Sequence, residues 1–187
     1  MSQRKVKLYI SMSLDGYIAT KEDDISWLSM VEQEGEDYGY HDFTKDIDTY
    51  IIGRSTYDVV LKLTGGDFPQ AKLYDCYVIT RSERGDENGV QFYNGEIKKL
   101  IHSLQQKEGK HIYCDGGGQI VKLLMENDLI DEYIISIIPI LLGEGKRLFI
   151  GGTNSISLQA IDSKQYPSGL IQLHYQRKVN NPKKVSM

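Results

Sequence analysis

The chain has 187 residues, enough for one ordinary domain with a buried core, and 40% of them are hydrophobic while 26% are charged. Its formal net charge of −4 at pH 7 argues against broad nucleic-acid binding. No apolar run approaches the roughly 18 residues of a membrane span, and the N-terminus leads straight into a strand-like segment rather than a signal-peptide core. We therefore expect a cytoplasmic protein that binds neither nucleic acid nor membrane.

Cysteines and histidines indicate neither a disulfide nor a metal site. Cys76 and Cys114 each lie inside an apolar run, which favours buried free thiols in a reducing compartment. The four histidines show no spacing typical of metal ligands, so we expect no metal.

Short apolar runs and alternating patterns predict strands along most of the chain. In chain order these strands cover residues 6–14, 17–19, 48–53, 73–80, 90–93, 112–115, 131–139, 156–160 and 170–177. Residues 54–63 and 97–104 carry apolar side chains at helical spacing, and a third helix opens at Gln119. Residues 20–37 are acidic and irregular, which indicates either a solvated loop and helix or part of a pocket wall.

The order of these elements predicts an α/β fold with a mixed sheet. Strands alternate with helices as far as residue 138, and the last two strands form an antiparallel hairpin around a turn at residues 166–170. We expect one domain over residues 1–179, followed by a disordered tail at 180–187.

Three consecutive glycines, Gly116, Gly117 and Gly118, join a predicted strand to a predicted helix. Strand, glycine turn and helix together bring bare backbone N–H groups up to a phosphate. Glycine suits this role because it adopts positive φ without strain and has no Cβ to keep a ligand away. A tight turn without any ligand would explain the glycines equally well.

Two other predicted strands end in residues suited to phosphate. Residues 53–56 (Gly-Arg-Ser-Thr) and 80–82 (Thr-Arg-Ser) each follow a buried strand, as residues 116–119 do. In a largely parallel sheet such ends share one edge, which is the usual ligand crevice. Guanidinium groups give bidentate bonds to phosphate, and hydroxyl and N–H groups fill the remaining lone pairs. Together the three ends favour a phosphate-bearing ligand, whereas each alone could be a solvated helix start or a turn.

Two common nucleotide motifs do not fit. Gly116-x-Gly118 is followed by Val121 where the dinucleotide fingerprint needs glycine or alanine, and no Gly-x4-Gly-Lys-Ser/Thr occurs.

The residues that do match resemble a known superfamily. Residues 53–57 (Gly-Arg-Ser-Thr-Tyr) and the glycine stretch resemble those of dihydrofolate reductases. Residues 11–19 (Ser-Met-Ser-Leu-Asp-Gly-Tyr-Ile-Ala) and residues 130–149 are more similar to the reductase domain of the bacterial riboflavin deaminase–reductase, the RibD C-terminal-domain family. The resemblance covers residues 5–178 and is more specific for the superfamily than for the substrate.

This resemblance implies a dihydrofolate-reductase-like three-layer fold, with about eight strands in a mostly parallel mixed sheet, and a homodimer. It also implies NADPH bound across the sheet edge. The positions that it assigns to the cofactor are Ser11, Ile18, Gly53, Arg54, Ser55, Thr56, Thr80, Arg81, Ser82, Gly116, Gly117, Gly118, Gln119 and Ile120.

Within this set, the resemblance gives each strand end a part of the cofactor. Residues 54–56 would meet the phosphates, residues 80–82 the adenosine 2′-phosphate, and residues 116–120 the pyrophosphate, with a cis peptide between Gly116 and Gly117. Ser11 and Ile18 would flank the nicotinamide.

The substrate side departs from both subfamilies. The phosphoribose-binding pattern of the riboflavin enzyme is absent, because residues 53–56 take the other subfamily's form. The acidic residue that binds pterin has its nearest candidate in Glu32, five residues after Trp27; a solvated carboxylate explains Glu32 as well. Asp15 is a second candidate, although an Asp-Gly turn accounts for it.

We expect an NADPH-dependent reductase whose substrate is a pteridine- or pyrimidine-type heterocycle. The heterocycle would lie near Ser11, Ile18 and an aromatic wall of Trp27, Tyr38, Tyr40 and Phe43, with Glu32 and Trp27 as catalytic candidates. A carboxyl of Glu32 in that apolar wall would have a raised pKa and could donate a proton. The alternative is a non-catalytic NADP-binding module or sensor.

Overall fold

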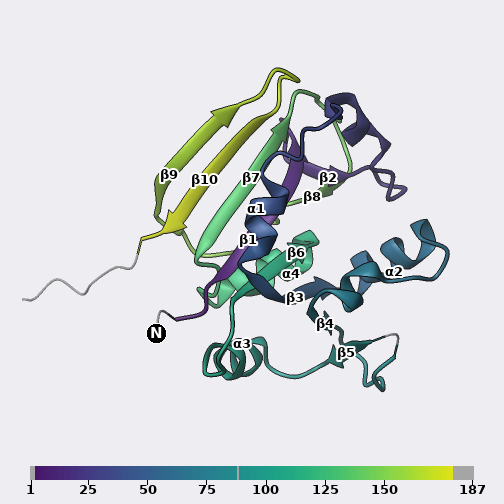
Figure 1. Cartoon of the computed structure of the whole chain (residues 1–187), viewed down its shortest axis with the longest axis vertical. Helices are drawn as coiled ribbons and strands as arrows, with labels where there is room; N and C mark the ends of the chain where they lie inside the picture. Colours follow the sequence, from purple (N-terminus) through teal and green to yellow (C-terminus); the bar gives the residue numbers. More distant parts are fainter. Residues whose placement is uncertain (1–2, 88, 179–187) are drawn as a thin grey trace, which may run out of the picture.

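The computed structural model describes residues 3–87 and 89–178, and its centre is a sheet of eight strands in the order β5-β4-β3-β6-β1-β7-β10-β9. The bounds are β1 Val6–Ser13, β3 Ile47–Gly53, β4 Asp75–Ile79, β5 Val90–Tyr93, β6 His111–Gly116, β7 Glu132–Ile138, β9 Leu158–Gln165 and β10 Ile171–Arg177. The first six strands of this order, from β5 to β7, run parallel to one another, whereas β10 is antiparallel to both β7 and β9 (Figure 1). The predicted mixed sheet with a C-terminal antiparallel hairpin is confirmed; the tail predicted at residues 180–187 lies outside the described residues.

Helices cover both faces of this sheet. On one face lie α3 (Ile97–Gln105) and α4 (Gly118–Glu126), and on the other α1 (Tyr40–Lys45) and α2 (Arg54–Leu63) (Figure 1). Short 3-10 helices, η1 (Ser26–Val31) and η2 (Pro69–Lys72), lie in the connections. The three layers that the resemblance implied are therefore present.

The two faces of strand β6 belong to different cores. Ile112 and Cys114 pack with the apolar sides of α3 and α4, while Tyr113 packs with the α1 and α2 side. Successive side chains of a strand point to opposite faces, so Asp115 shares its face with Tyr113. On α3 the predicted spacing holds, because the four side chains at i, i+3, i+4 and i+7 from Ile97 are all buried. Burial of each such side chain contributes about 1.5–3 kcal/mol.

A second, two-stranded sheet was not predicted. β2 (Tyr17–Ala19) pairs with β8 (Lys146–Arg147), where the sequence had predicted no strand. The Arg147 guanidinium lies 4.6 Å from the centroid of the Tyr17 ring, and its Nη2 donates to the Tyr17 hydroxyl at 3.0 Å. Side-chain contacts between the two strands therefore hold a ribbon too short to be visible in an apolar pattern.

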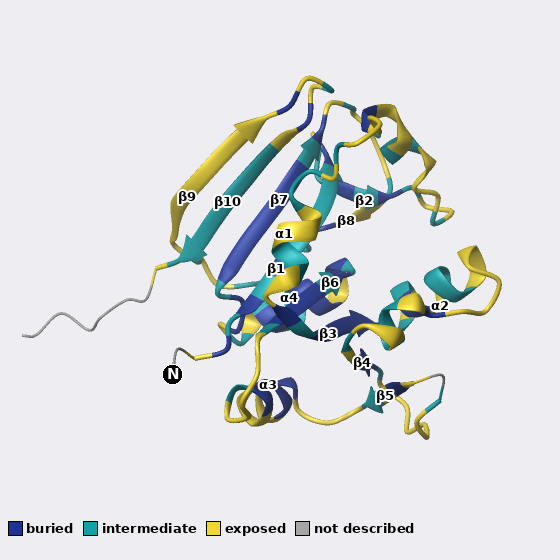
Figure 2. Cartoon of the chain, in the orientation of Figure 1, coloured by how far each residue is buried: buried dark blue, intermediate teal, exposed yellow. Residues whose placement is uncertain are grey.

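Strand β9 is an edge strand whose two faces both lie open. All eight of its residues are exposed, including Leu158 and Ile161, as the colouring in Figure 2 shows. The alternating pattern had predicted a strand at residues 156–160, whereas β9 covers Leu158–Gln165. None of the described helices packs on β9, so its apolar side chains face no core.

The two cysteines are buried free thiols, as predicted. Burial raises the pKa of Cys76 and of Cys114 to about 12, so neither is a thiolate at neutral pH. In the described ranges, no three or more His, Cys, Asp or Glu side chains gather as a metal site would require. None of the helices described is long and apolar enough to cross a membrane.

Candidate functional site

Three strand ends lie side by side at one edge of the sheet, as the sequence predicted. In the parallel pairs, Gly53 of β3 lies opposite Ile79 of β4, and Ile52 lies opposite Gly116 of β6. Thr80 follows directly after Ile79. The three polar segments therefore begin at nearly the same height along the parallel strands, within one or two residues of each other. We call Gly53, Gly116, Gly117 and Gly118 the glycine edge.

Tight packing explains part of the requirement for glycine at this edge. A Cβ on Gly53 would lie 2.7 Å from Cγ1 of Ile120, and one on Gly118 would lie 2.3 Å from the carbonyl oxygen of Arg147. Gly116 has φ +102°, a conformation that favours glycine, and the Gly116–Gly117 peptide is cis, as the resemblance implied. The protein itself therefore excludes side chains at Gly53 and Gly118, whatever ligand binds.

At Gly117 the space is shared with two other segments. Its N–H donates to Oγ1 of Thr56 at 2.9 Å, and a Cβ there would lie 3.0 Å from the same oxygen and 3.4 Å from Cδ1 of Ile18. Thr56 lies on α2 and Ile18 on β2, so three of the segments that the resemblance assigned to the cofactor meet at Gly117.

Two helices begin at this edge without side-chain caps. Gly53 is the N-cap of α2 and Gly117 the N-cap of α4, and neither helix has a side-chain hydrogen bond at its cap. The first-turn N–H groups of a helix have no intrahelical partners and carry the positive end of the helix dipole. Two such ends at one edge are suited to a pyrophosphate.

Guanidinium groups gather beside the start of α2. Arg54 donates from Nε to both carboxylate oxygens of Asp58, at 2.7 and 2.9 Å, and its guanidinium lies 5.7 Å from the centroid of the Phe92 ring. Arg84 lies 4.7 Å from the same ring. Arg81 is exposed. Sequence reasoning missed Arg84, because it lies in an irregular loop; the only signal was a second arginine three residues after Arg81.

Hydroxyl groups of Thr80 and Ser82 lie together at the end of β4. Their oxygens are 3.3 Å apart, and the Ser82 N–H also points to Oγ1 of Thr80 at 3.3 Å. On the far side of β6, Ser11 of β1 pairs with Ser136 of β7 and is half-buried. Ser55 and Gln119 are exposed in the first turns of α2 and α4. These placements are compatible with the cofactor roles, which stay predictions.

The predicted aromatic wall is divided between two clusters. Trp27 and Tyr38 pack around Tyr166 at the end of the hairpin, whereas Tyr40 and Phe43 pack on Tyr9. Trp27 therefore packs against the end of β7, and no contact joins it to the glycine edge among the described residues. Its catalytic role stays a prediction.

Glu32 does not have the apolar setting that was expected. Helix η1 ends at Val31, which is the buried residue of that turn, and Glu32 follows it as an exposed C-cap. The expectation of a carboxyl enclosed by apolar side chains is therefore wrong for Glu32. Trp27 lies within a single stretch of 3-10 helix that ends before Glu32.

Another carboxyl lies at the glycine edge and was missed. Asp115 accepts hydrogen bonds from the hydroxyls of Tyr50 and Tyr113, each at 2.5 Å, and it immediately precedes Gly116. Burial raises the pKa of Asp115, against the two hydroxyl bonds, which lower it. We call Asp115, Tyr50 and Tyr113 the carboxyl cluster. The signal in the sequence was an acidic residue at the end of a buried strand.

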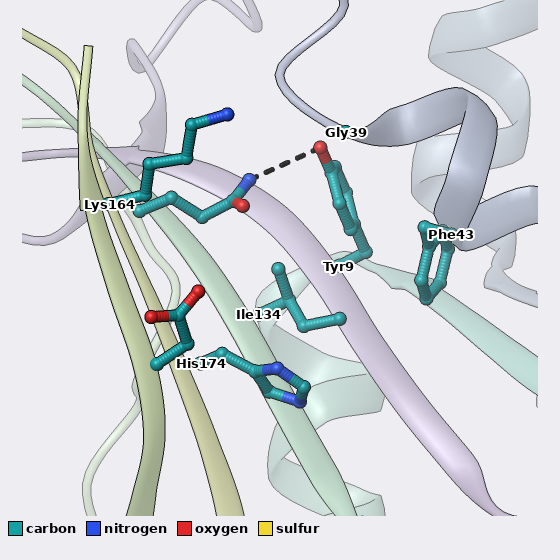
Figure 3. Close-up of a pocket in the computed structure, with 8 residues that line it drawn as sticks. Tyr9, Gly39, Phe43, Ile134, Lys164 and His174 are labelled. Atoms are coloured by element: carbon teal, nitrogen blue, oxygen red, sulfur yellow. Dashed lines mark hydrogen bonds between the residues drawn. The ribbon is translucent and has the colours of Figure 1, made fainter.

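A small pocket opens on the face of the sheet that α1 covers, the face that also carries Tyr113 (Figure 3). It has a volume of about 110 Å³ and is lined by Tyr9, Phe43, Lys164 and His174, among others. Sites for small molecules and cofactors usually measure about 300–1,000 Å³, so this pocket is too small for a dinucleotide. The Phe43 ring, 4.6 Å from Tyr9 and 5.0 Å from Tyr113, lies between the pocket and the carboxyl cluster.

Comparison with known proteins gives relatives along nearly the whole chain. The family model described as the RibD C-terminal domain matches residues 4–172. The uncharacterized protein YwjB of Bacillus subtilis (strain 168) is 42% identical over 176 residues, which cover 94% of this chain and 99% of that protein. The uncharacterized protein YyaP of the same strain is 30% identical over 188 residues, covering 94% and 96%.

Solved structures show the same architecture. A putative riboflavin biosynthesis protein from Shewanella sp. PV-4 superimposes with a TM-score of 0.83 and 32% identity, covering 94% of this chain and 99% of that one. Dihydrofolate reductase from Enterococcus faecalis, complexed with NADP(H), has a TM-score of 0.66 and 16% identity, covering 95% and 98%. The deaminase/5-amino-6-(5-phosphoribosylamino)uracil reductase of Thermotoga maritima has a TM-score of 0.70 and 14% identity, covering 94% of this chain and 57% of that one. The last two establish the shared fold alone.

Proposed function

The chain belongs to the RibD C-terminal domain family, and on that premise we propose that it is a reductase that uses NADPH to reduce a pteridine- or pyrimidine-type heterocycle. The fold relatives include a dihydrofolate reductase complexed with NADP(H) and a 5-amino-6-(5-phosphoribosylamino)uracil reductase. Both names describe reductases of nitrogen heterocycles, which supports this substrate class.

One observation carries the proposal: two helices without side-chain caps begin at the same glycine edge. Their N–H groups suit the two phosphates of a dinucleotide. Residues 54–56 hold phosphate in this proposal, and residues 116–120 pass beneath the pyrophosphate. In this proposal the guanidinium groups of Arg81 and Arg84 and the hydroxyls of Thr80 and Ser82 hold a 2′-phosphate, a group that NADH lacks.

The bound cofactor supplies the hydride, and the residues of the chain bind, orient and exclude water. Ile18 on β2 lies against Gly117 and closes one side of the edge. Ser11 at the end of β1 lies on the other side of β6. A heterocycle between these residues would lie directly over the end of β6.

The first experiment is a calorimetric titration with NADPH and NADH, followed by a steady-state assay of NADPH oxidation. Dihydrofolate and the pyrimidine substrate of the riboflavin pathway are the two heterocycles to test. We expect a dissociation constant for NADPH at least about tenfold below that for NADH, since each charge-assisted bond contributes about 1.5–3 kcal/mol. We also expect turnover of one heterocycle. NADPH binding without turnover would favour a binding module or sensor, and absence of NADPH binding would overturn the proposal.

A homodimer in a reducing, cytoplasmic setting is part of the same proposal. The exposed apolar side chains of β9 and β10, Leu158, Ile161 and Ile171, support an interface at this end of the sheet. Light scattering should then give twice the chain mass of 21.3 kDa. A mass of one chain at micromolar concentration would contradict it.

A further inference from the structure

We propose that the pocket in Figure 3 is a second binding site, distinct from the glycine edge, and that it takes a primary ammonium group on a short apolar chain. Figure 3 shows the Tyr9 and Phe43 rings on one side of the pocket and His174 coming from a hairpin strand on the other. The lining therefore divides into an apolar wall and a polar wall, and the two walls together define the ligand. Binding at this site is independent of the reductase function proposed above.

One row of side chains across four strands forms the floor of the pocket. In the strand registers, Tyr9 of β1 lies beside Ile134 of β7. Ile134 lies beside His174 of β10, which in turn lies beside Asp162 of β9. Ile171 is an odd number of residues from His174 on the same strand, so it points to the opposite face. The dimer interface proposed at Ile171 therefore leaves the pocket open.

The apolar wall consists of Tyr9, Phe43 and Ile134. The rings of Tyr9 and Phe43 pack together with centroids 4.6 Å apart and planes tilted by 33°. The pocket volume of about 110 Å³ is smaller than that of an engineered cavity of about 150 Å³ that binds benzene. The pocket therefore suits a group of a few heavy atoms rather than a ring system as large as a pteridine.

Two donors of the polar wall are already bound by the protein. The hydroxyl of Tyr9 donates to the carbonyl oxygen of Tyr38 at 3.0 Å. Nε2 of Gln172 donates to the same carbonyl oxygen at 3.0 Å and to Oγ of Ser136 at 3.1 Å. A side-chain amide has two N–H hydrogens, so both are used in these bonds.

The acceptors of the polar wall keep unused lone pairs. The Asp162 carboxylate accepts the Ser163 N–H at Oδ1, and among the described residues nothing donates to its Oδ2. The hydrogen bonds of the Gln172 side chain run through its nitrogen, which leaves Oε1 available. Nε2 of His174 lies 3.4 Å from Oε2 of Glu132, and a bond there needs the ring hydrogen on Nε2. In the neutral ring, Nδ1 is then a third acceptor.

Three acceptors on one wall favour a ligand that brings three donors. A primary ammonium has three N–H donors, and its charge complements the Asp162 carboxylate. Its positive charge is also attracted by the ring faces of Tyr9 and Phe43. A carboxylate or phosphate would bring only acceptors. A metal ion fits less well, because in the described part of the chain no three His, Cys, Asp or Glu side chains gather as ligands.

Lys164 also lines the pocket, but its ammonium is held elsewhere. Its Nζ lies 4.3 Å from the centroid of the Tyr166 ring. The pKa of Lys164 is raised, first by a hydrogen bond with Tyr166 and further by the carboxylates of Glu36 and Asp162. Lys164 therefore competes with a cationic ligand for the same carboxylates, and its removal should strengthen binding.

The experiment is a titration of the isotope-labelled protein with n-butylammonium chloride, followed by ¹H–¹⁵N correlation spectra. Sodium butyrate and n-butanol, of the same chain length, are the anionic and neutral controls. We expect saturable shifts of the Gln172 side-chain amide and of backbone amides in β9 and β10. Because Asp162 is exposed, the dissociation constant should be on the order of 10 mM. Neither control should saturate below about 50 mM.

Three variants identify the groups that hold the ammonium. Asp162→Asn should weaken butylammonium binding about three- to fivefold. Lys164→Gln should strengthen it about threefold, because a like charge is removed. Asp75→Asn makes the same charge change as Asp162→Asn at an exposed position where β4 begins, and it should bind as the wild type does. All three replaced side chains are exposed, so each variant should fold.

Absence of saturable shifts with butylammonium would overturn the inference, as would equal affinity in Asp162→Asn and the wild type. Saturable binding of butyrate that Lys164→Gln weakens would identify an anion site and overturn it as well. Titration of the same samples with NADPH is a separate readout, so failure at this pocket leaves the proposed function standing.

Discussion

Strand β6 carries two kinds of site on adjacent residues. At the glycine edge the groups presented to a ligand are backbone N–H groups, and packing excludes side chains at Gly53 and Gly118. One residue earlier, the carboxyl cluster presents a carboxyl and two phenols drawn from β3 and β6. The glycine edge depends on the space that glycine leaves open, and the carboxyl cluster depends on the protonation state of Asp115. We therefore expect the glycine edge to respond to added volume and the carboxyl cluster to respond to pH.

The largest effect should follow from adding volume at Gly117. Gly117→Val would place a Cβ 3.0 Å from Oγ1 of Thr56, on the surface that the pyrophosphate occupies in our proposal. We expect NADPH binding to weaken at least about 100-fold, which corresponds to about 2.7 kcal/mol. Calorimetry measures the loss.

The control for this change is Gly151→Val, because a Cβ on Gly151 meets nothing within 4 Å. It should bind NADPH as the wild type does. A fault in packing alone would lower the melting temperature of Gly117→Val and leave its affinity intact, and this result would return the glycines to a turn without a ligand.

A smaller effect is expected where side chains supplement the backbone site. Arg81→Ala and Arg84→Ala should each reduce the preference for NADPH over NADH about tenfold, with little change for NADH. Lys107→Ala removes an exposed positive charge elsewhere on the chain and controls for the change in net charge. Because both arginines are solvent-accessible, added salt should narrow the preference. Equal loss for both cofactors would place the arginines on the pyrophosphate instead.

The pH response of stability isolates the carboxyl cluster. The pKa of Asp115 is raised above its ordinary value of 3.8, first by burial, so the folded state holds this proton more tightly than the unfolded chain. Stability falls with rising pH wherever the folded state binds more protons. The wild type should therefore lose stability relative to Asp115→Asn as pH rises from about 4 toward the folded-state pKa of Asp115.

Chemical denaturation at a series of pH values measures this difference. A constant gap between the wild type and Asp115→Asn from acidic to neutral pH would mean that Asp115 titrates as an ordinary exposed carboxyl. The glycine-edge variant Gly117→Val should show no such change of gap, because it adds no titrating group.

The smallest effect concerns the ribbon that carries Ile18 to the glycine edge. Arg147→Gln removes the cation–π contact with Tyr17 and should cost about 0.5–1 kcal/mol of stability. Lys146→Gln, on the same strand, removes only an exposed ion pair with Asp23 and should cost less. Equal costs would mean that the guanidinium stacking contributes nothing of its own.

The glycine edge could be predicted because its signals are local. Each of its segments is an apolar strand followed directly by glycine or hydroxyl residues, and parallel strands bring such ends together without further information. The β2–β8 ribbon could not be predicted in this way, since a two-residue strand of Lys146 and Arg147 has no apolar pattern.

The carboxyl cluster was missed because its parts are distant in sequence. Tyr50 lies 65 residues from Asp115, and nothing in either segment signals the other. Glu32 was preferred because it follows Trp27 by five residues, whereas η1 ends one residue before Glu32. The pattern that could have indicated the site is a buried strand that ends in an acidic residue and has a tyrosine two positions before it.

Gly118 brings the glycine edge into direct main-chain contact with strand β8 and the residue that follows it. A Cβ there would lie 2.3 Å from the carbonyl oxygen of Arg147 and 3.2 Å from that of Leu148, so two main chains touch without side chains between them. Such a contact has no rotamers that could absorb a displacement. We therefore expect a displacement of β8 to move the first turn of α4 with it.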